Sequence, residues 1–358
     1  MREIFSSAYY ARVMEEFGYA PTGESYGFEP ITFSLGSLTS EDLSIKWLCH
    51  SDGVNFSERF SRRYPSLVVT GIGLSGPPHV GTLSQILRAI TLQRAGVPVQ
   101  FVLGDLDAYN GKKVPLSTVR ELAERYRRFV TKLGFNTEPP NILRSQEEKD
   151  ALPVLRTAYL LFSYFGDEKL AATEEDLHDF YVKEGKVDSQ MTLPRKASLV
   201  LMLADFVHPA ISSERNNIMV TLGIDEHKYV VPLMQALDSL KRDGLVSENT
   251  LIARLYSPII KGLFGYPKMS KSFPKSGIFA GIGRDTIEDL LLNGDQNNDE
   301  NNYDPYSNPV FQIALAVMLL HPPEVEELGR WCQENGNAWR NFKLDLASYL
   351  YSLFNLWE

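Results

Sequence analysis

The segment that most restricts the possible folds is an apolar run that leads into a glycine-rich turn and then a helical pattern. Leu67, Val68 and Val69 are typical of a buried strand. Residues 71–78 contain three glycines and two prolines, and no regular element persists through such a stretch. Apolar residues then recur at helical spacing over 83–92, and a new strand is expected near 97. This order predicts a β-α-β unit whose turn can approach a phosphate at the helix N-terminus.

The end of this turn carries the first candidate ligand-binding residues. Gly81 leaves the backbone open to a ligand, and His79 can donate a hydrogen bond to a phosphate oxygen. A strand-to-helix turn that merely needs glycine for its geometry explains this segment equally well. A phosphate site and a plain tight turn therefore both remain open.

A second polar segment lies about 190 residues downstream, at Lys-Met-Ser-Lys-Ser over 268–272. Glycine and proline occur on both sides of it, which predicts a loop. The ammonium groups of Lys268 and Lys271 are compact charges with three donors each, and serine hydroxyls add further donors. The composition suits a mobile clamp on polyphosphate, whereas a solvated loop is the ordinary alternative.

Together the two segments resemble the paired ATP-binding motifs of the class I aminoacyl-tRNA synthetases. Residues 79–82 resemble the first motif, usually written HIGH, and residues 268–272 match the second, KMSKS, letter for letter. Shorter stretches narrow the resemblance to the tryptophanyl and tyrosyl subclass, and within it to tryptophanyl enzymes of the archaeal and eukaryotic type. These stretches are residues 70–81, 198–205, 222–228 and 272–279.

The resemblance implies a fold and a set of roles. The implied fold is α/β, with a doubly wound parallel-sheet (Rossmann-like) catalytic domain, a helical insertion and a short C-terminal helical module. ATP and Mg²⁺ are the implied cofactors, His79, Lys268 and Lys271 are the implied catalytic residues, and no metal-ligating residue is implied. The implied ATP-binding residues are Gly71, Gly73, Ser75, His79, Gly81, Thr82, Gly223, Asp225, Lys268, Met269, Ser270, Lys271 and Ser272.

The same resemblance implies an amino-acid site formed by Val69, Met202, Asp205 and Glu226. A carboxylate beside the apolar run at 201–204 needs a donor, such as the indole or phenol of a substrate, or else a local partner. Glu226 stands where the family normally has glutamine, and Val69 replaces an aromatic or tyrosine contact. Tryptophan is therefore favoured as substrate, while tyrosine and other aromatic amino acids stay open. For Asp225, a ribose contact and a simple helix N-cap are both open.

The predicted domains are an N-terminal helical and turn-rich segment over 1–60, the catalytic domain over 61–280 with a helical insertion at about 145–195, and a C-terminal helical module over 281–358. Residues 294–303 are acidic and rich in amides, which predicts a loop. Further expected helices cover residues 5–17, 41–49, 120–133, 196–208, 225–241, 308–320, 324–335 and 338–356, and a strand covers 217–222.

The predicted activity is ATP-dependent formation of an aminoacyl-adenylate, followed by transfer to tRNA. Only residues 273–358 follow the second motif, which is short for a helical module that reads an anticodon. An enzyme that transfers the activated amino acid to a non-tRNA acceptor is therefore the alternative. A non-enzymatic regulator or tRNA-binding relic would have no need of the histidine and lysines of the two motifs.

Composition agrees with this class. The chain has 358 residues, 44% of them hydrophobic, enough for an α/β core and a helical module. Two cysteines, Cys49 and Cys332, are expected to be buried and free. No signal-peptide pattern and no apolar run of membrane-spanning length occur, so a cytoplasmic protein without membrane contact is expected, and the family implies a homodimer. The net charge of −9 neither indicates nor excludes a nucleic-acid partner.

Overall fold

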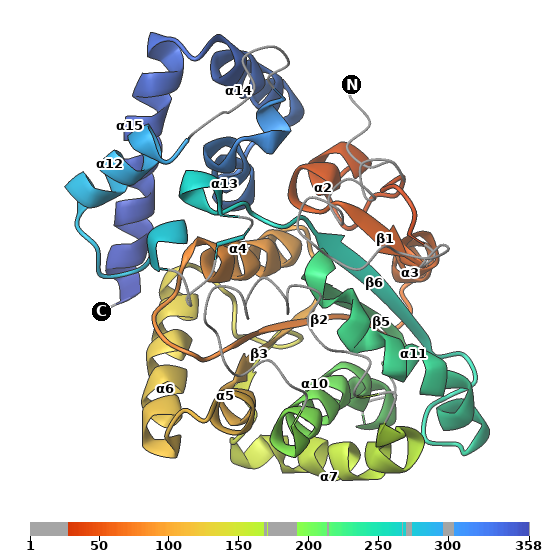
Figure 1. Ribbon diagram of the computed structural model, residues 1–358. Helices are drawn as coiled ribbons and strands as arrows, with labels where there is room; N and C mark the ends of the chain where they lie inside the picture. The colour runs from red at the N-terminus through yellow and green to blue at the C-terminus, as the bar shows by residue number, and fades with distance from the viewer. Residues whose placement is uncertain are drawn as a thin grey trace. The chain divides into compact units, whose positions relative to one another are not determined.

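The computed structural model describes residues 28–167, 170, 192–212, 215–266, 268–269, 274–295 and 304–357 (Figure 1). Their contacts divide the chain into two compact units. The first unit comprises Met1–Ser75, Thr91–Arg127 and Asn136–Pro258, and the second comprises Gly76–Ile90, Arg128–Phe135 and Ile259–Glu358. The expected helix at 5–17 and most of the expected loop at 294–303 lie outside the described residues.

The first unit is built on a six-stranded sheet with the order β1-β6-β5-β2-β3-β4. Every neighbouring pair is parallel except β1 and β6, which are antiparallel. This mainly parallel sheet with its helices confirms the predicted α/β, Rossmann-like class. The strands are β1 (Cys49–Ser51), β2 (Ser66–Gly73), β3 (Val99–Gly104), β4 (Ile142–Ser145), β5 (Asn217–Gly223) and β6 (Leu251–Ser257).

Strand β2 lies at the point where the strand order reverses, because β3 and β4 follow on one side while β5 and β6 follow on the other. In open parallel sheets, ligands bind outside the carboxyl ends of the strands at such a reversal. Val69 pairs with Val220 and Gly71 with Val102, so the glycine-rich end of β2 lies beside the ends of both neighbours. A Cβ on Gly71 would stand 2.5 Å from the carbonyl oxygen of Val102, which explains the glycine there.

Strands β2, β3 and β5 form where the sequence has apolar runs, and all six residues of β3 are buried. The expected helix at 41–49 is wrong at its end, since the helix stops at Lys46 and Cys49 begins β1 by pairing with Tyr256. Trp47, directly after the helix, donates its indole N–H to Thr221 Oγ1 at 2.9 Å. The helices assigned to this unit are α2 (Ser40–Lys46), α3 (Gly53–Ser61), α5 (Asp105–Lys112), α7 (Leu152–Leu161), α10 (Leu193–Ser212) and α11 (His227–Arg242).

The second unit contains the C-terminal helices, of which the sequence predicts α13, α14 and α15 but not α12. A buried carboxylate links them: Asp295 accepts from the Trp339 indole at 2.9 Å and from the Lys343 ammonium at 3.0 Å. Helix α13 is shorter than expected because Met318 has an extended backbone. These helices are α12 (Arg284–Asn293), α13 (Pro309–Val317), α14 (Pro322–Glu334) and α15 (Asn337–Phe354), while α4 (Val80–Arg94) and α6 (Leu116–Lys132) have residues in both units.

Two predictions about single features can also be compared with the structure. Cys49 and Cys332 are both free and buried, as the composition indicates. Within the described ranges, no helix is long and apolar enough to cross a membrane.

Candidate functional site

The imidazole of His79 caps helix α4. Its Nδ1 accepts a hydrogen bond from the backbone N–H of Thr82 at 3.2 Å. The first N–H groups of a helix have no partner within the helix, so a side-chain acceptor at this position stabilises the turn. An Nδ1 that accepts this bond requires the neutral tautomer to carry its proton on Nε2. His79 therefore has an Nε2–H donor held in a fixed ring orientation.

Gly81 is required by this arrangement. A Cβ on Gly81 would stand 2.6 Å from Cε1 and 2.9 Å from Nδ1 of His79. The sequence suggests that this glycine opens the backbone to a ligand, whereas the structure shows that it makes room for the imidazole ring. The side chain of Thr82, a predicted nucleotide contact, is buried at the start of α4.

The early motif is hydrogen-bonded to the segment that follows the late loop. The Val80 N–H donates to the Ile278 carbonyl at 3.1 Å, and the Ala280 N–H donates to the Pro78 carbonyl at 2.9 Å. Between them, His79 and Phe279 form an antiparallel bridge, and their rings meet edge to face at 5.9 Å. Both segments belong to the second unit. The fold thus ties the residues just after the KMSKS-like loop to the histidine of the first motif.

The beginning of the late loop is anchored as well. The Met269 N–H donates to the Ile260 carbonyl at 3.2 Å, and the Met269 side chain is buried. Gly277 lies against that side chain. Lys268, next to it, is partly buried. The other predicted residues of this motif, Ser270, Lys271 and Ser272, lie outside the described residues.

The carboxyl edge of the sheet in the first unit brings together charges that the sequence analysis missed. A Cβ on Gly73 would stand 3.3 Å from Oδ2 of Asp107 and 3.7 Å from Nζ of Lys112. Burial raises the pKa of Asp107, and the nearby Lys112 opposes that change. The available signal for Asp107 was the pair of acidic residues, Asp105 and Asp107, within three positions of the end of a buried strand. Ser75, another predicted nucleotide contact, follows Gly73 in the turn.

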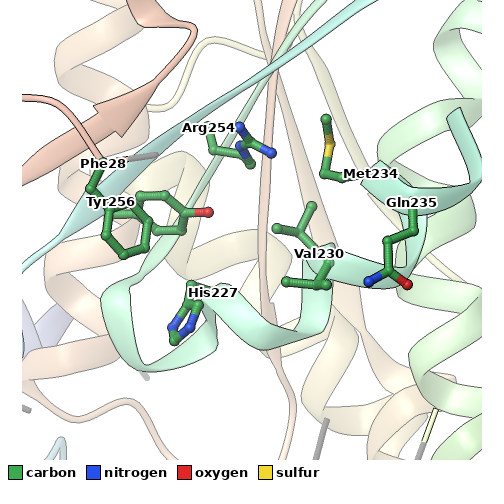
Figure 2. A pocket seen from close by; sticks show the side chains of 8 residues that line it. Phe28, His227, Val230, Met234, Gln235, Arg254 and Tyr256 are labelled. Atoms are coloured by element: carbon green, nitrogen blue, oxygen red, sulfur yellow. The ribbon is translucent and has the colours of Figure 1, made fainter. Parts of the chain in front are cut away.

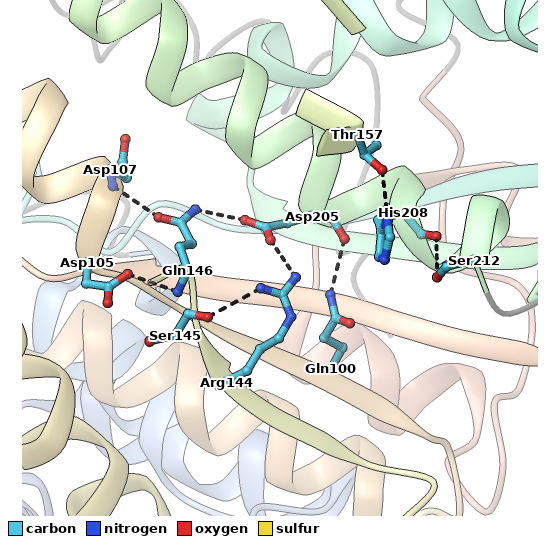
Figure 3. A network of polar contacts seen from close by, with 10 residues as sticks. All are labelled: Gln100, Asp105, Asp107, Arg144, Ser145, Gln146, Thr157, Asp205, His208 and Ser212. Carbon is cyan, nitrogen blue, oxygen red and sulfur yellow. Dashed lines mark hydrogen bonds and ion pairs between the residues drawn. The ribbon is translucent and has the colours of Figure 1, made fainter. Parts of the chain in front are cut away.

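Asp205 lies at the centre of a polar network within the first unit (Figure 3). It is only 2% exposed, and its two carboxylate oxygens accept from Arg144 at 2.5 Å and from Gln146 at 2.8 Å. Gln146 in turn accepts from the Asp107 backbone N–H at 3.0 Å. Burial raises the pKa of Asp205, and the Arg144 guanidinium beside it opposes this effect.

Arg144 and Gln146 supply the donors that the sequence analysis assigned to a substrate or a local partner. Both residues are at least nine-tenths buried, and they follow one another closely at the end of β4. Nothing in the sequence around them indicates burial, because arginine and glutamine are usually exposed. The two apolar members of the predicted amino-acid site are Val69, buried in β2, and Met202, partly buried on α10.

The turn just before α11 holds the predicted residues Gly223, Asp225 and Glu226. The Glu226 carboxylate accepts from the Gly223 backbone N–H at 3.1 Å, so its charge is partly used within its own turn. The N-cap of α11 is Glu226 and that of the short preceding 3₁₀ turn is Gly223. The N-cap interpretation of Asp225 is therefore wrong, and its carboxylate lies against Gly223.

No cluster of three or more His, Cys, Asp or Glu side chains suited to a metal ion occurs in the part of the chain that the structure describes.

Comparison with known proteins finds similarity to tRNA synthetases. Residues 62–147 match the family model of class I tRNA synthetases (W and Y). The tryptophan–tRNA ligase of Methanocaldococcus jannaschii is 22% identical over 331 residues, which cover 88% of this chain and 84% of that protein. The tyrosine–tRNA ligase of Methanopyrus kandleri is 30% identical over 209 residues, 56% of each chain.

The fold agrees with these matches. The crystal structure of tryptophanyl-tRNA synthetase from Aeropyrum pernix superposes with a TM-score of 0.73 at 16% identity, covering 98% of this chain and 89% of that one. Residues 62–147 thus match a class I tRNA synthetase (W and Y) domain, and the chain is similar over most of its length to a tryptophan–tRNA ligase, whose fold it shares.

Proposed function

We propose that this protein uses ATP to activate an amino acid as its adenylate and then transfers the aminoacyl group to tRNA. The observation that carries the proposal is the backbone bridge between residues 78–80 and 278–280. It joins the histidine of the first motif to the segment that follows the lysines of the second. The first motif and the start of the second, Lys268 and Met269, belong to one compact unit, which supports the proposal.

The reaction needs positioned charge rather than a covalent catalyst. An oxygen of the amino-acid carboxylate attacks the α-phosphorus of ATP, the bond to the β-phosphate bridging oxygen breaks, and pyrophosphate leaves. In our proposal, the Nε2–H of His79 donates to a phosphate oxygen, while Lys268 and Lys271 stabilise the negative charge that grows on the leaving group. Mg²⁺, when bound with ATP, shares that charge. Gly71, Gly73, Ser75, Gly223 and Asp225 are proposed to contact the nucleotide, Asp225 at the ribose.

Tryptophan is the substrate that we favour, with Val69, Met202, Asp205 and Glu226 around it. Both oxygens of Asp205 already accept from protein donors. An indole or phenol donor must therefore share or replace the contact from Arg144 or Gln146. Asp205 is thus already hydrogen-bonded within the protein before any substrate binds. This keeps a second candidate function open, in which the enzyme activates another amino acid and transfers it to a non-tRNA acceptor.

ATP–pyrophosphate exchange with a panel of the twenty amino acids tests the first step, and charging of total tRNA tests the second. We expect exchange with an aromatic amino acid, led by tryptophan. Exchange without charging would select the non-tRNA acceptor, and absence of exchange with every amino acid would refute the proposal.

Lys271→Ala tests the role of the late loop. Loss of one preorganised charge that contacts the transition state costs about 10²–10³-fold in rate. We expect that decrease in exchange, with amino-acid binding unchanged. Lys275→Ala is the matched control, since Lys275 is exposed just outside the motif. Equal rates for the Lys271 variant and the wild type would remove this lysine from the mechanism.

A further inference from the structure

A pocket lies in the first unit, between helix α11 and strand β6 (Figure 2). Its volume is about 260 Å³. Its walls are mainly apolar, from Phe28, Val230, Val231, Met234 and the ring of Tyr256, and its polar lining comes from His227, Gln235 and Arg254. None of the residues that we assign to ATP or the amino acid lines it.

The secondary structure explains why these side chains meet. Arg254 and Tyr256 are two residues apart on β6, so they project from the same face of the sheet. Val230 and Met234 are four apart on α11 and share one face of that helix. Phe28 closes the pocket with its ring edge-on to Tyr256, at 5.1 Å between ring centroids.

Arg254 is a cation whose donors are largely unused. Its side chain is only 16% exposed, and its nearest carboxylate is Asp52, at 3.6 Å and itself 42% exposed. Among the described residues, the guanidinium has no hydrogen-bond acceptor, and Nε is buried without one. Buried polar groups are normally paired, and a guanidinium offers five donors suited to a planar anion.

Tyr256 presents a second donor to the same space. The residue is 2% exposed, and its hydroxyl points into the pocket (Figure 2). Across the described ranges, this hydroxyl has no hydrogen-bond partner either. Burial raises the pKa of the phenol, so the hydroxyl keeps its proton and remains a donor.

We propose that this pocket binds a small carboxylic acid with an apolar body. The carboxylate accepts hydrogen bonds from Arg254 and Tyr256, and the body packs against Phe28, Val230 and Met234. The volume lies near the lower end of the usual range for ligand pockets, about 300–1,000 Å³, which selects a one-ring or short-chain molecule. The inference stands independently of the proposed activity.

Calorimetric titration of the full chain with phenylacetate and hexanoate tests the proposal. Each acid is compared with its amide, which keeps the shape and removes the charge. We expect the acids to bind about tenfold or more tightly than the amides, because charge-assisted hydrogen bonds are the stronger ones. Equal affinity of acid and amide, or no binding of either acid at millimolar concentration, would overturn the proposal.

Variants locate the site. Arg254→Met keeps the length and removes the charge, and we expect it to lower phenylacetate affinity about tenfold while leaving that of the amide unchanged. Tyr256→Phe should lower it several-fold. Arg242→Met is the control, since Arg242 is exposed at the far end of α11.

Two further measurements test whether phenylacetate binds at the proposed catalytic site instead. Phenylacetate affinity should be the same in His79→Asn and in the presence of ATP. Competition by ATP, or an unchanged affinity in folded Arg254→Met, would place the acid elsewhere and refute the pocket. If Arg254→Met fails to fold, as circular dichroism will show, the comparison of acid with amide and Tyr256→Phe decide the question.

Discussion

At the scale of single residues, His79 has two roles that substitution can separate. Asparagine can still accept the Thr82 N–H through its side-chain oxygen, whereas alanine cannot. We expect His79→Ala to lower the free energy of unfolding by about 1 kcal/mol, the usual value of an N-cap, and His79→Asn to change it little. Both variants should lose about 10²–10³-fold in pyrophosphate exchange, because the Nε2–H donor is gone.

Urea unfolding and exchange kinetics on the same preparations check this separation. An asparagine variant with the wild-type exchange rate would show that the ring serves only the helix. An alanine variant with wild-type stability would show that the cap contributes nothing.

His50 makes stability depend on pH. It is fully buried, its Nδ1 accepts from the Gly53 N–H at 3.1 Å, and its Nε2 donates to the Pro30 carbonyl at 3.0 Å. Burial lowers the pKa of His50, although Glu29, the Pro30 carbonyl and Asp52 oppose this. The unfolded chain therefore binds this proton more readily than the folded protein. The free energy of unfolding should decrease as the pH falls below about 6.5, by up to about 1.4 kcal/mol per pH unit for one histidine.

Denaturant titrations between about pH 7.5 and pH 5.5 measure this slope. His50→Asn keeps an acceptor for Gly53 but cannot titrate, so its slope should be shallower by up to one proton. His208, which is partly buried, and His227, which is buried, also have lowered pKa values and will leave part of the slope in place. An identical slope in variant and wild type would contradict the assignment.

At the scale of elements, the bridge between residues 78–80 and 278–280 anchors the late loop. Ala280→Pro removes the N–H that donates to Pro78, whereas Ala280→Ser keeps it. A hydrogen bond of this kind contributes about 0.5–1.5 kcal/mol, so we expect KM for ATP to rise about tenfold in the proline variant. KM for the amino acid should stay constant in both. A proline variant with unchanged KM for ATP would show that the bridge does not position the loop.

The same elements show what sequence alone can predict. β2 and the C-terminal helices are visible because apolar residues recur with the period of a strand or a helix. The bridge is not visible, because it is made by backbone groups of residues about 200 positions apart, which leave no local pattern. The roles of Arg144 and Gln146 could not be predicted from the sequence either, because both side chains are paired with Asp205, which lies on a different element, helix α10. Candidate residues that lie in short motifs can be named from the sequence, whereas the contacts that long-range pairing brings to them cannot.

At the scale of the whole molecule, contacts group Gly76–Ile90 with Ile259–Glu358, although the first segment directly follows β2. His79 of the first motif and Lys268 of the second therefore belong to the second unit. The carboxyl ends of the sheet strands belong to the first unit. A division of this kind follows from contacts across the chain. Composition and local periodicity carry no information about it.

The exposed apolar residues around α7 lead to a final prediction about assembly. Tyr159 is 80% exposed and Phe162 is 42% exposed, and Leu193, at the start of α10, is 77% exposed. Helices α7 and α10 pack together, so these exposed residues lie on neighbouring elements of the first unit. Contiguous exposed apolar residues mark interaction surfaces, and a twofold dimer buries the same patch on both copies. We therefore propose a homodimer through this face.

Light scattering after size exclusion should give twice the chain mass. The double variant Tyr159→Glu, Phe162→Glu should raise the dissociation constant of the dimer about 100-fold, because it buries like charges in the interface. Tyr64→Glu, at a residue 43% exposed elsewhere on the unit, is the control and should remain dimeric. A monomeric wild type, or a dimeric double variant, would contradict the assignment of this face.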